Sequence, residues 1–246
     1  MKKKKRLDQI LVERGSAGTR AKAQAIIMSG EVYVEGKQIL KSGLSFLENS
    51  KIIIKDKNKE WVSRGSYKLL KALENFDINI ENKICLDLGS STGGFTHVLL
   101  SNKAKKIYAV DVGTNQLHEK LLNEKKIISI EKTNARYLNR KLITDNIDVI
   151  VCDVSFISVK KIIKPNLCFL KNNSIIIILI KPQFEANKKE IKKGVVRDPN
   201  IHNRICEDIK TWLINECKSK IIGLVESPIK GPKGNIEFLV VAKYYK

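Results

Sequence analysis

Apolar runs of five to eight residues alternate with helix-like stretches through the last three-quarters of the chain. The strand candidates are KICLDL at 83–88, KIYAVD at 106–111, KIISI at 126–130, IDVIVCD at 147–153, SIIIILIK at 174–181, KIIGLV at 220–225 and IEFLVVAK at 236–243. Strands separated by crossover helices predict an α/β domain with a parallel sheet covered on both faces. Ligands of such sheets bind beyond the carboxyl ends of the strands. We therefore expect the chemistry at 87–95, 111, 152–155 and 181–185.

The pattern at the start of the chain is different. RLDQILVERG and TRAKAQAIIMSG space their apolar residues three and four apart and stop at Gly15 and Gly30, which predicts two short helices. EVYVEGKQI alternates like a hairpin around Glu35 and Gly36, and SKIIIK supplies another strand. The polar run KDKNKEWVSRGS then separates the two patterns. We predict an α+β domain at 1–57, a linker at 58–66 and an α/β domain at 67–246.

Composition limits the class of protein. The 246 residues are 43% hydrophobic, which is enough for a sizeable core and a small second domain. The basic N-terminus lacks the apolar region of a signal peptide, and no apolar stretch reaches about 18 residues. We expect a cytoplasmic protein without a membrane partner. Five widely spaced cysteines without a C-x-x-C pair indicate small core residues, and neither a disulfide nor a metal site is predicted.

Charge is the strongest bulk signal. Lys and Arg number 46 against 26 Asp and Glu, a formal net charge of +20. Residues 1–57 carry +7 and the remainder +13, so both domains would attract phosphate. Nucleic acid is the expected partner, although scattered lysines can also form an ordinary solvated surface.

The loop DLGSSTGGF follows the first α/β strand. It lacks the G-x-G-x-x-G step of a dinucleotide site and the G-x-x-x-x-G-K-[ST] of a triphosphate site. Asp87 at the strand end points toward an amine-bearing ligand, and Asp111 after the next strand suits the paired hydroxyls of a ribose. S-adenosylmethionine carries both groups. Tight strand–helix packing alone also explains a glycine loop.

The N-terminal domain resembles the small RNA-binding domain, or alpha-L motif, first known from ribosomal small-subunit protein four. The matching residues are Arg6, Leu7, Asp8, Gly15, Thr19, Arg20, Ala23, Gly30 and the segment 32–36. The resemblance implies that Arg6, Arg14, Arg20 and Lys22 contact RNA phosphates. Each of them is equally compatible with a solvent-facing helix position.

The resemblance extends over nearly the whole chain. The motifs are WVSRGSYKL at 61–69, LDLGSSTGGFT at 86–96, YAVDVGTNQL at 108–117, CDVSFIS at 152–158, LIKPQFE at 179–185, KGVVRD at 193–198 and GPKGNIEFL at 231–239. Together they resemble the TlyA or haemolysin A family, with Ser66 where the family usually has glycine. This implies a Rossmann-like class I S-adenosylmethionine-dependent methyltransferase sheet of the FtsJ-like type. It also implies methylation of a ribose 2'-hydroxyl, of cytidine in 16S or 23S ribosomal RNA or both.

FtsJ-like enzymes use a Lys-Asp-Lys-Glu tetrad, which the resemblance places at Lys68, Asp153, Lys181 and Glu237. A ribose hydroxyl is a poor nucleophile, so the site must take its proton while aligning it with the methyl group. Our hypothesis is that Lys181, after losing a proton, is the base. The charge of Lys68 would favour that loss, and the two carboxylates would orient the lysines.

The resemblance also implies the cofactor site. The expected cofactor-binding residues are Asp87, Gly89, Ser90, Gly93, Gly94, Phe95, Asp111, Asn134 and Ala135. Arg64 is a further candidate for RNA contact, and Phe156 and Phe184 for packing on the target nucleotide.

Two other functions remain open. A basic chain of this kind could disturb membranes, as the older family name implies, or it could bind ribosomal RNA or ribosomal subunits as an assembly factor without turnover. The sequence gives no sign of an obligate protein partner.

Overall fold

The computed structural model describes residues 4–54 and 61–246, which form two compact units divided between Glu60 and Trp61. Residues 58–60 of the predicted linker lie outside the described residues. Residues 61–66, which we also expected in the linker, belong to the second unit. The reason is local packing, because the Trp61 ring lies edge-on to His97 at 4.9 Å and buried Ser66 donates to the Gly94 carbonyl at 2.8 Å.

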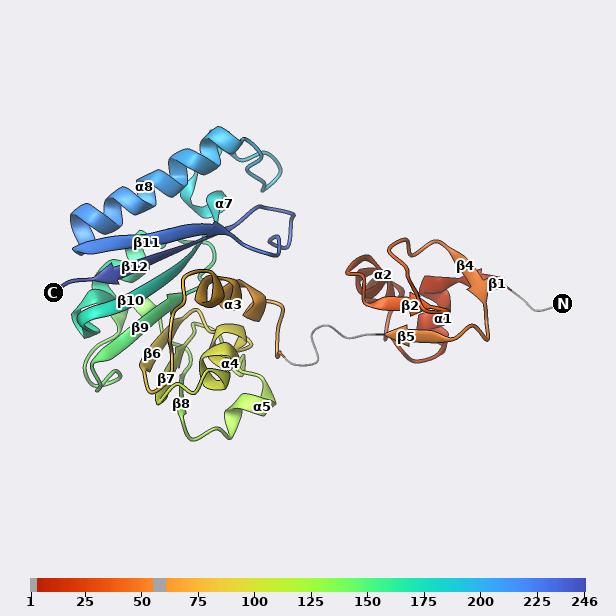
Figure 1. Cartoon of the computed structure of the whole chain (residues 1–246), viewed down its shortest axis with the longest axis horizontal. Helices are drawn as coiled ribbons and strands as arrows, with labels where there is room; N and C mark the ends of the chain where they lie inside the picture. Colours follow the sequence, from red (N-terminus) through yellow and green to blue (C-terminus); the bar gives the residue numbers. More distant parts are fainter. Residues whose placement is uncertain (1–3, 55–60) are drawn as a thin grey trace. The chain divides into compact units, whose positions relative to one another are not determined.

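The first unit combines two helices with short strands (Figure 1). Its elements are β1 (Lys4–Arg6), α1 (Leu7–Glu13), α2 (Arg20–Met28), β2 (Val32–Val34), β3 (Lys37–Gln38), β4 (Ser45–Leu47) and β5 (Ile52–Ile54). β2 pairs with β3 and β5, all antiparallel, and Glu35 and Gly36 turn the predicted hairpin with positive φ angles. The pairing of β1 with β4 was not predicted from the sequence.

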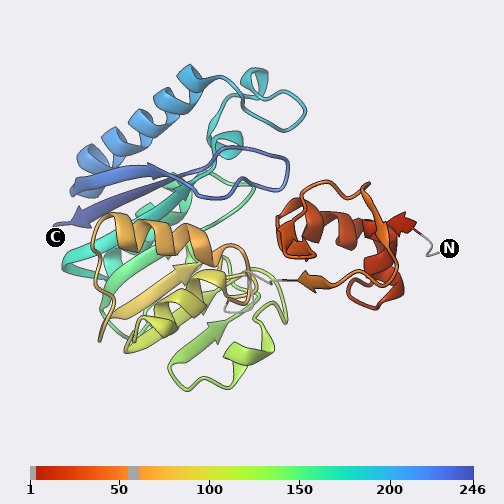
Figure 2. The same cartoon turned by 45° about the vertical axis from the view of Figure 1, so that its right-hand side comes forward.

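Both helices of this unit end where the glycines predict. Gly15 and Gly30 have φ angles of +69° and +77°, which a glycine adopts without strain. At the other end of α2, the Thr19 hydroxyl caps the helix by accepting from the Lys22 amide at 3.2 Å. α1 and α2 pack against each other (Figure 2) and share one apolar cluster with β2.

The second unit is built on a seven-stranded sheet (Figure 1). Its strands are β6 (Ile84–Leu88), β7 (Lys106–Val110), β8 (Ile127–Ile130), β9 (Ile147–Cys152), β10 (Leu170–Ile180), β11 (Ser219–Glu226) and β12 (Phe238–Tyr244). They lie in the order β11-β12-β10-β9-β6-β7-β8. All seven strand predictions are confirmed. The sheet is mostly parallel, as expected, and the exception is β12, which runs antiparallel to both β10 and β11.

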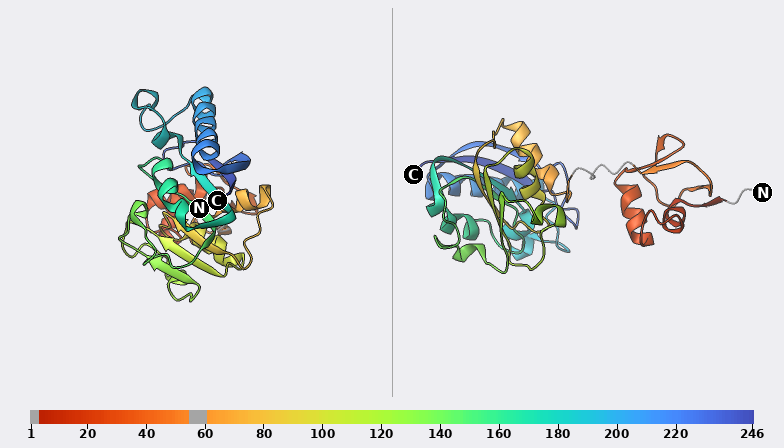
Figure 3. Two further views of the ribbon diagram at one scale, coloured as in Figure 1. Left: turned by 90° about the vertical axis from the view of Figure 1, so that its left-hand side faces the viewer. Right: turned by 90° about the horizontal axis from the view of Figure 1, so that it is seen from below.

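Helices cover both faces of this sheet (Figures 1 and 3). α3 (Ser66–Asn75) and α4 (Gly94–Ser101) pack on one face, and α6 (Lys160–Asn166) and α8 (Pro199–Cys217) pack on the other. The remaining short helices are α5 (Glu119–Leu122), η1 (Ala135–Tyr137), η2 (Leu167–Phe169), α7 (Pro182–Glu185) and η3 (Lys188–Glu190). None of the helices described in residues 4–54 and 61–246 is long and apolar enough to cross a membrane.

The cysteines largely follow the prediction of small core residues. Cys85, Cys152, Cys206 and Cys217 are buried, whereas Cys168 is exposed in η2, directly after α6. Within the described part of the chain, no group of three or more His, Cys, Asp or Glu residues could hold a metal ion.

Candidate active site at the carboxyl edge of the sheet

The topology brings four predicted residues to one edge of the sheet. Asp153 follows β9 and Lys181 follows β10, so both lie at the carboxyl end of a parallel strand. Glu237 immediately precedes β12. Because β12 is antiparallel to β10, with Phe238 opposite Ile180, the start of β12 meets the same edge. Lys68 reaches it from the first turns of α3.

These four side chains form an alternating chain of charges. Lys68 Nζ donates to Glu237 Oε2 at 2.8 Å and lies 3.6 Å from Asp153 Oδ2. Lys181 Nζ lies 2.5 Å from Asp153 Oδ1. Both lysines are 8% exposed and Glu237 is 1% exposed. We call these four residues the tetrad. Its two cations and two anions cancel, so the cluster has no formal net charge. This pairing matters because charged groups are tolerated in the interior of a protein only when they are paired.

Ser155 is a member of the site that residue types alone did not identify. Its hydroxyl accepts a hydrogen bond from Lys181 Nζ at 2.8 Å. The available signal was its place in CDVSFIS, two residues after Asp153. Ser155 and Asp153 together fix the Lys181 ammonium on two sides.

The glycine loop after β6 lies against Asp153. Gly89 has φ +85°, and a Cβ at this position would lie 2.8 Å from the Asp153 carbonyl oxygen. Gly93, at φ +90°, is the N-cap of α4, and a Cβ there would meet the side-chain ends of Leu121 and Leu117. Both positions therefore favour glycine for conformation, and Gly89 also for space, because the atom it would strike belongs to the backbone.

Two cavities follow this loop. The glycine-loop cavity, of about 190 Å³, is bordered by Gly89, Ser90, Gly94, Phe95, Asp153 and Lys181, among others. The Asp111 cavity, of about 410 Å³, is bordered by Gly89, Asp111, Asn134, Ala135, Asp153 and Ile157, among others. Seven of the nine predicted cofactor residues border one of them, and Gly89 borders both.

Asp87 and Gly93 border neither of these two cavities. Asp87 is fully buried within β6, and its Oδ2 accepts from Thr96 Oγ1 at 2.6 Å. Its Oδ1 has no hydrogen-bond partner among the described residues. Burial is the main cause that raises the pKa of Asp87 to about 7. We predicted that this carboxylate would contact an amine of the ligand. In the structure it lies beneath the loop, without exposed surface, and borders neither cavity.

Asp111 is held by backbone amides. Its Oδ2 accepts from Ser91 N at 2.8 Å and its Oδ1 accepts from Gly113 N at 2.7 Å. Each carboxylate oxygen can accept a further hydrogen bond. Asp111 is thus a fixed acceptor at the wall of its cavity.

A third cavity lies on the other side of the tetrad. This phenylalanine cavity, of about 360 Å³, is bordered by Phe156, Lys181, Gln183, Phe184, Asn235 and Glu237, among others. The rings of Phe156 and Phe184 are 5.0 Å apart. Phe156 is 91% exposed and has a φ of +63°, which is uncommon for an aromatic residue.

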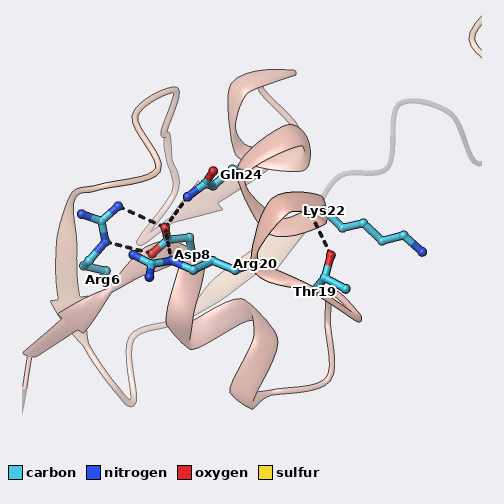
Figure 4. A network of polar contacts seen from close by, with 6 residues as sticks. All are labelled: Arg6, Asp8, Thr19, Arg20, Lys22 and Gln24. Atoms are coloured by element: carbon cyan, nitrogen blue, oxygen red, sulfur yellow. Dashed lines mark hydrogen bonds and ion pairs between the residues drawn. The ribbon is translucent and has the colours of Figure 1, made fainter.

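The predicted RNA-binding residues of the first unit fall into two groups. Arg6 and Arg20 both bond the buried carboxylate of Asp8 (Figure 4). Arg14 instead donates Nη2 to the backbone carbonyls of Glu48 and Ser50, which gives it a role in holding that loop.

The other two candidates have different surroundings. The Lys22 side chain is exposed on α2 and extends away from the Asp8 group (Figure 4). Arg64 is exposed in the second unit and borders none of the three cavities above.

Comparison with known proteins gives the class of this sheet and its strand-end cavities. A model of FtsJ-like methyltransferases matches residues 61–244, and a model of the S4 domain matches residues 5–45. "Hemolysin A" of Brachyspira hyodysenteriae is 44% identical over 236 residues, which cover 95% of this chain and 98% of that protein. "16S/23S rRNA (cytidine-2'-O)-methyltransferase TlyA" of Mycobacterium tuberculosis is 36% identical over 242 residues, 98% of this chain and 90% of that protein.

Solved structures agree with these matches. A protein assigned as a hemolysin from Streptococcus thermophilus is 36% identical with a TM-score of 0.77, covering 100% of this chain and 90% of that one. A structure assigned as an S-adenosylmethionine-dependent methyltransferase from Listeria monocytogenes is 16% identical with a TM-score of 0.55, covering 74% of this chain and 99% of that one, and supports the fold alone. The chain belongs to the TlyA or haemolysin A family of FtsJ-like methyltransferases, so the predicted family and fold class are confirmed.

Proposed function

We propose that this protein transfers the methyl group of S-adenosylmethionine to the ribose 2'-hydroxyl of a cytidine in ribosomal RNA. One observation carries the proposal: Lys181 Nζ is held by Asp153 and Ser155 between the glycine-loop cavity and the phenylalanine cavity. A candidate base thus stands between a space for the cofactor and a space for a nucleotide. The name of the Mycobacterium tuberculosis relative supports the choice of cytidine and of ribosomal RNA.

The residues of the first two cavities fit the proposed cofactor. The cavities share Gly89, Ser91, Asp153 and Ser155, so one elongated molecule can extend along both. Among their described lining residues Lys181 is the only basic one, which suits a ligand without a pyrophosphate. Asp111 would accept from the ribose hydroxyls, and Asn134 and Ala135 would border the adenine.

The methionine part would lie along Gly89, Ser90, Gly94 and Phe95, which border the glycine-loop cavity. When bound, S-adenosylmethionine supplies an electrophilic methyl group on a sulfonium.

The tetrad performs the proton chemistry in this proposal. Lys181, in its neutral form, accepts the proton of the 2'-hydroxyl at Nζ, and Asp153 and Ser155 keep the nitrogen in position. Loss of that proton would make the ribose oxygen nucleophilic enough to take the methyl group that bound S-adenosylmethionine would supply. Lys68, paired with Glu237, holds the other oxygen of Asp153 and so fixes the carboxylate that orients Lys181.

The nucleotide would occupy the phenylalanine cavity. Phe156 is almost fully exposed beside Phe184, and base–aromatic stacking is the usual way to hold an unstacked base. The first unit would bind structured RNA through Arg6, Arg20 and Lys22, and Arg64 would add a phosphate contact from the second unit. Cytoplasmic ribosomal subunits are the proposed partners.

The test is transfer of labelled methyl from S-adenosylmethionine to ribosomal subunits that lack the modification, with the labelled nucleotide mapped. We expect label on a ribose 2'-oxygen. Lys181→Met should lower the rate by about 10²–10⁴-fold, the usual contribution of a positioned acid or base. Lys171→Met is the matched control, because Lys171 lies near the other end of β10 in an exposed pair with Asp148.

Three outcomes would contradict the proposal. Near-normal transfer by folded Lys181→Met would remove Lys181 as the base. Absence of label on either subunit and on free ribosomal RNA, with cofactor binding intact, would favour a binding factor without turnover. Leakage of liposomes without any methyl transfer would favour the membrane-active alternative.

A further inference from the structure

One buried carboxylate organises the charged surface of the first unit. Asp8 has no exposed surface, yet it accepts four hydrogen bonds (Figure 4). Arg6 donates Nε and Nη2 at 3.1 Å each, Arg20 donates Nε at 3.0 Å and Gln24 donates Nε2 at 2.9 Å. Asp8, at the start of α1, therefore connects this helix to β1 and to the first two turns of α2.

The bonds to Asp8 leave part of each guanidinium for a ligand. The Arg6 and Arg20 side chains remain 42% and 51% exposed. Arg20 reaches Asp8 through Nε alone, and Arg6 leaves Nη1 outside its paired contact. A guanidinium fixed on one side by a carboxylate keeps a planar set of donors in a defined direction, which suits a phosphate.

The geometry around Asp8 favours RNA binding, but its negative charge is expected to weaken it. A carboxylate beside two arginines cancels part of their positive potential and so weakens the long-range attraction of RNA. Hydrogen bonds from Arg6 above all, and also from Gln24 and Arg20, hold the pKa of Asp8 well below its usual range, so this negative charge persists at neutral pH. Geometry and charge thus give opposite expectations for the effect of Asp8 on RNA affinity.

We propose that Asp8 is a positioning residue for RNA binding, which aligns the Arg6 and Arg20 guanidiniums so that both engage the phosphate backbone of one RNA segment. The inference rests on the proposed RNA-binding function and names the residue that prepares the surface for it. The alignment outweighs the charge that Asp8 adds.

The experiment measures binding of the full chain to ribosomal subunits that lack the modification, without S-adenosylmethionine and at a fixed salt concentration. Asp8→Asn keeps the shape and removes the charge. We expect it to bind about tenfold more weakly, although the protein has become more positive. Glu13→Gln makes the same charge change at an exposed carboxylate that pairs with Lys5, and it should bind equally or more tightly. Asp8→Asn that binds as tightly as Glu13→Gln would overturn the proposal.

A second measurement separates positioning from general damage to the unit. In an Arg6→Ala/Arg20→Ala background, Asp8→Asn should weaken binding no further, because Asp8 acts only through those two side chains. A further loss of tenfold in that background would show a structural role and overturn the proposal. Because binding is measured without turnover, failure of methyl transfer alone leaves this result unaffected.

If Asp8→Asn does not fold, the wild-type protein still decides the matter. The Nε–H signals of Arg6 and Arg20 in its ¹⁵N NMR spectrum should be resolved and slowly exchanging before RNA is added. Nε–H signals that overlap with those of solvent-exposed arginines such as Arg197, and exchange as fast, would contradict a fixed geometry.

Discussion

Asp8 in the RNA-binding unit and Asp87 in the methyltransferase unit are both shielded from solvent, yet their pKa values shift in opposite directions. Neither carboxylate has exposed surface. Asp8 accepts four hydrogen bonds, three of them from guanidiniums, and its pKa is held far below the usual range, chiefly by Arg6. Asp87 accepts one bond from Thr96, and burial raises its pKa to about 7. At Asp8 the hydrogen bonds from charged donors outweigh the effect of burial, whereas at Asp87 burial outweighs the single hydroxyl donor.

Asp153 shows a third arrangement. Its side chain is 19% exposed and lies between two buried lysines, and it borders the glycine-loop and Asp111 cavities. Asp8 holds two cations whose free ends face outward, whereas Asp153 holds two cations that face inward. The first arrangement suits recognition of a large polyanion, and the second suits chemistry on one small group.

The largest expected effect comes from Asp153. Asp153→Asn removes the charge between Lys68 and Lys181 and releases the orientation of the proposed base. We expect methyl transfer to fall by about 10²–10⁴-fold. Binding of ribosomal subunits should stay within about twofold, because this residue lies outside the RNA-binding unit. Single-turnover transfer and equilibrium binding measure the two quantities.

The same pair of measurements can contradict this division of roles. Asp8→Asn should change binding while the transfer rate at saturating RNA is kept. Equal losses of binding in both variants would show that the two carboxylates do not serve separate steps.

The next largest effect is the pH dependence of folding stability that Asp87 causes. Its carboxyl is protonated more readily in the folded state than in the unfolded state, where its pKa is 3.8. Between about pH 4 and 7 the folded state binds the extra proton, so stability should fall as pH rises through that window. One pKa unit is worth about 1.4 kcal/mol, so the contribution is at most about 4 kcal/mol. Asp87→Asn should abolish it.

Denaturant unfolding of wild type and Asp87→Asn at pH 5 and pH 8 checks this prediction. The variant should gain stability relative to wild type at pH 8, and the difference should be smaller at pH 5. A difference that does not change with pH would show that Asp87 is ionised in the folded protein throughout this range.

A smaller effect is expected at the glycine loop. Gly89→Ala combines a positive φ with a collision against the Asp153 carbonyl, and should cost about 2–3 kcal/mol. Gly234 has a similar φ of +86° but no atom within 4 Å of its Cβ position. Gly234→Ala should therefore cost only about 1–2 kcal/mol. Thermal unfolding compares the two variants, and equal costs would contradict a steric role for the Asp153 carbonyl.

These comparisons show what the sequence can predict. The seven strands, the hairpin at Glu35 and Gly36 and the glycine ends of α1 and α2 follow from periodicity and turn residues, which are local properties. The meeting of Lys68 with Glu237, 169 positions apart, depends on the antiparallel direction of β12, which no local pattern encodes. Only the resemblance to a family suggested it.

The sequence also could not distinguish similar residues. Asp87 lies inside β6, with Leu88 after it, and its side chain is buried, whereas Asp111 follows the last residue of β7 and borders a cavity. Asp87 pairs with Ala109, so two positions along the strand direction separate a buried carboxylate from one that borders a cavity. In the same way Arg14 and Arg20 look alike in sequence, but Arg14 is held by backbone carbonyls and Arg20 by Asp8.

The smallest expected effect removes one neutral donor from each of the two buried carboxylates. Gln24→Met takes one of four hydrogen bonds from Asp8, and Thr96→Val takes the one side-chain donor that the described residues give Asp87. Each should cost about 1 kcal/mol at pH 8, the typical net value of one hydrogen bond. Denaturant unfolding at pH 5 and pH 8, followed with separate signals for the two units, gives the cost of each substitution at each pH.

Their pH dependence should differ. Asp8 keeps its arginine donors in Gln24→Met and stays ionised, so the cost of this substitution should be the same at pH 5 and pH 8. Asp87 is neutral at pH 5 and ionised at pH 8, and a hydroxyl bonds a carboxylate more strongly than a carboxylic acid. The cost of Thr96→Val should therefore be smaller at pH 5. If the two substitutions respond alike to pH, donor number does not control the ionisation of these two residues, and the contrast between the units fails.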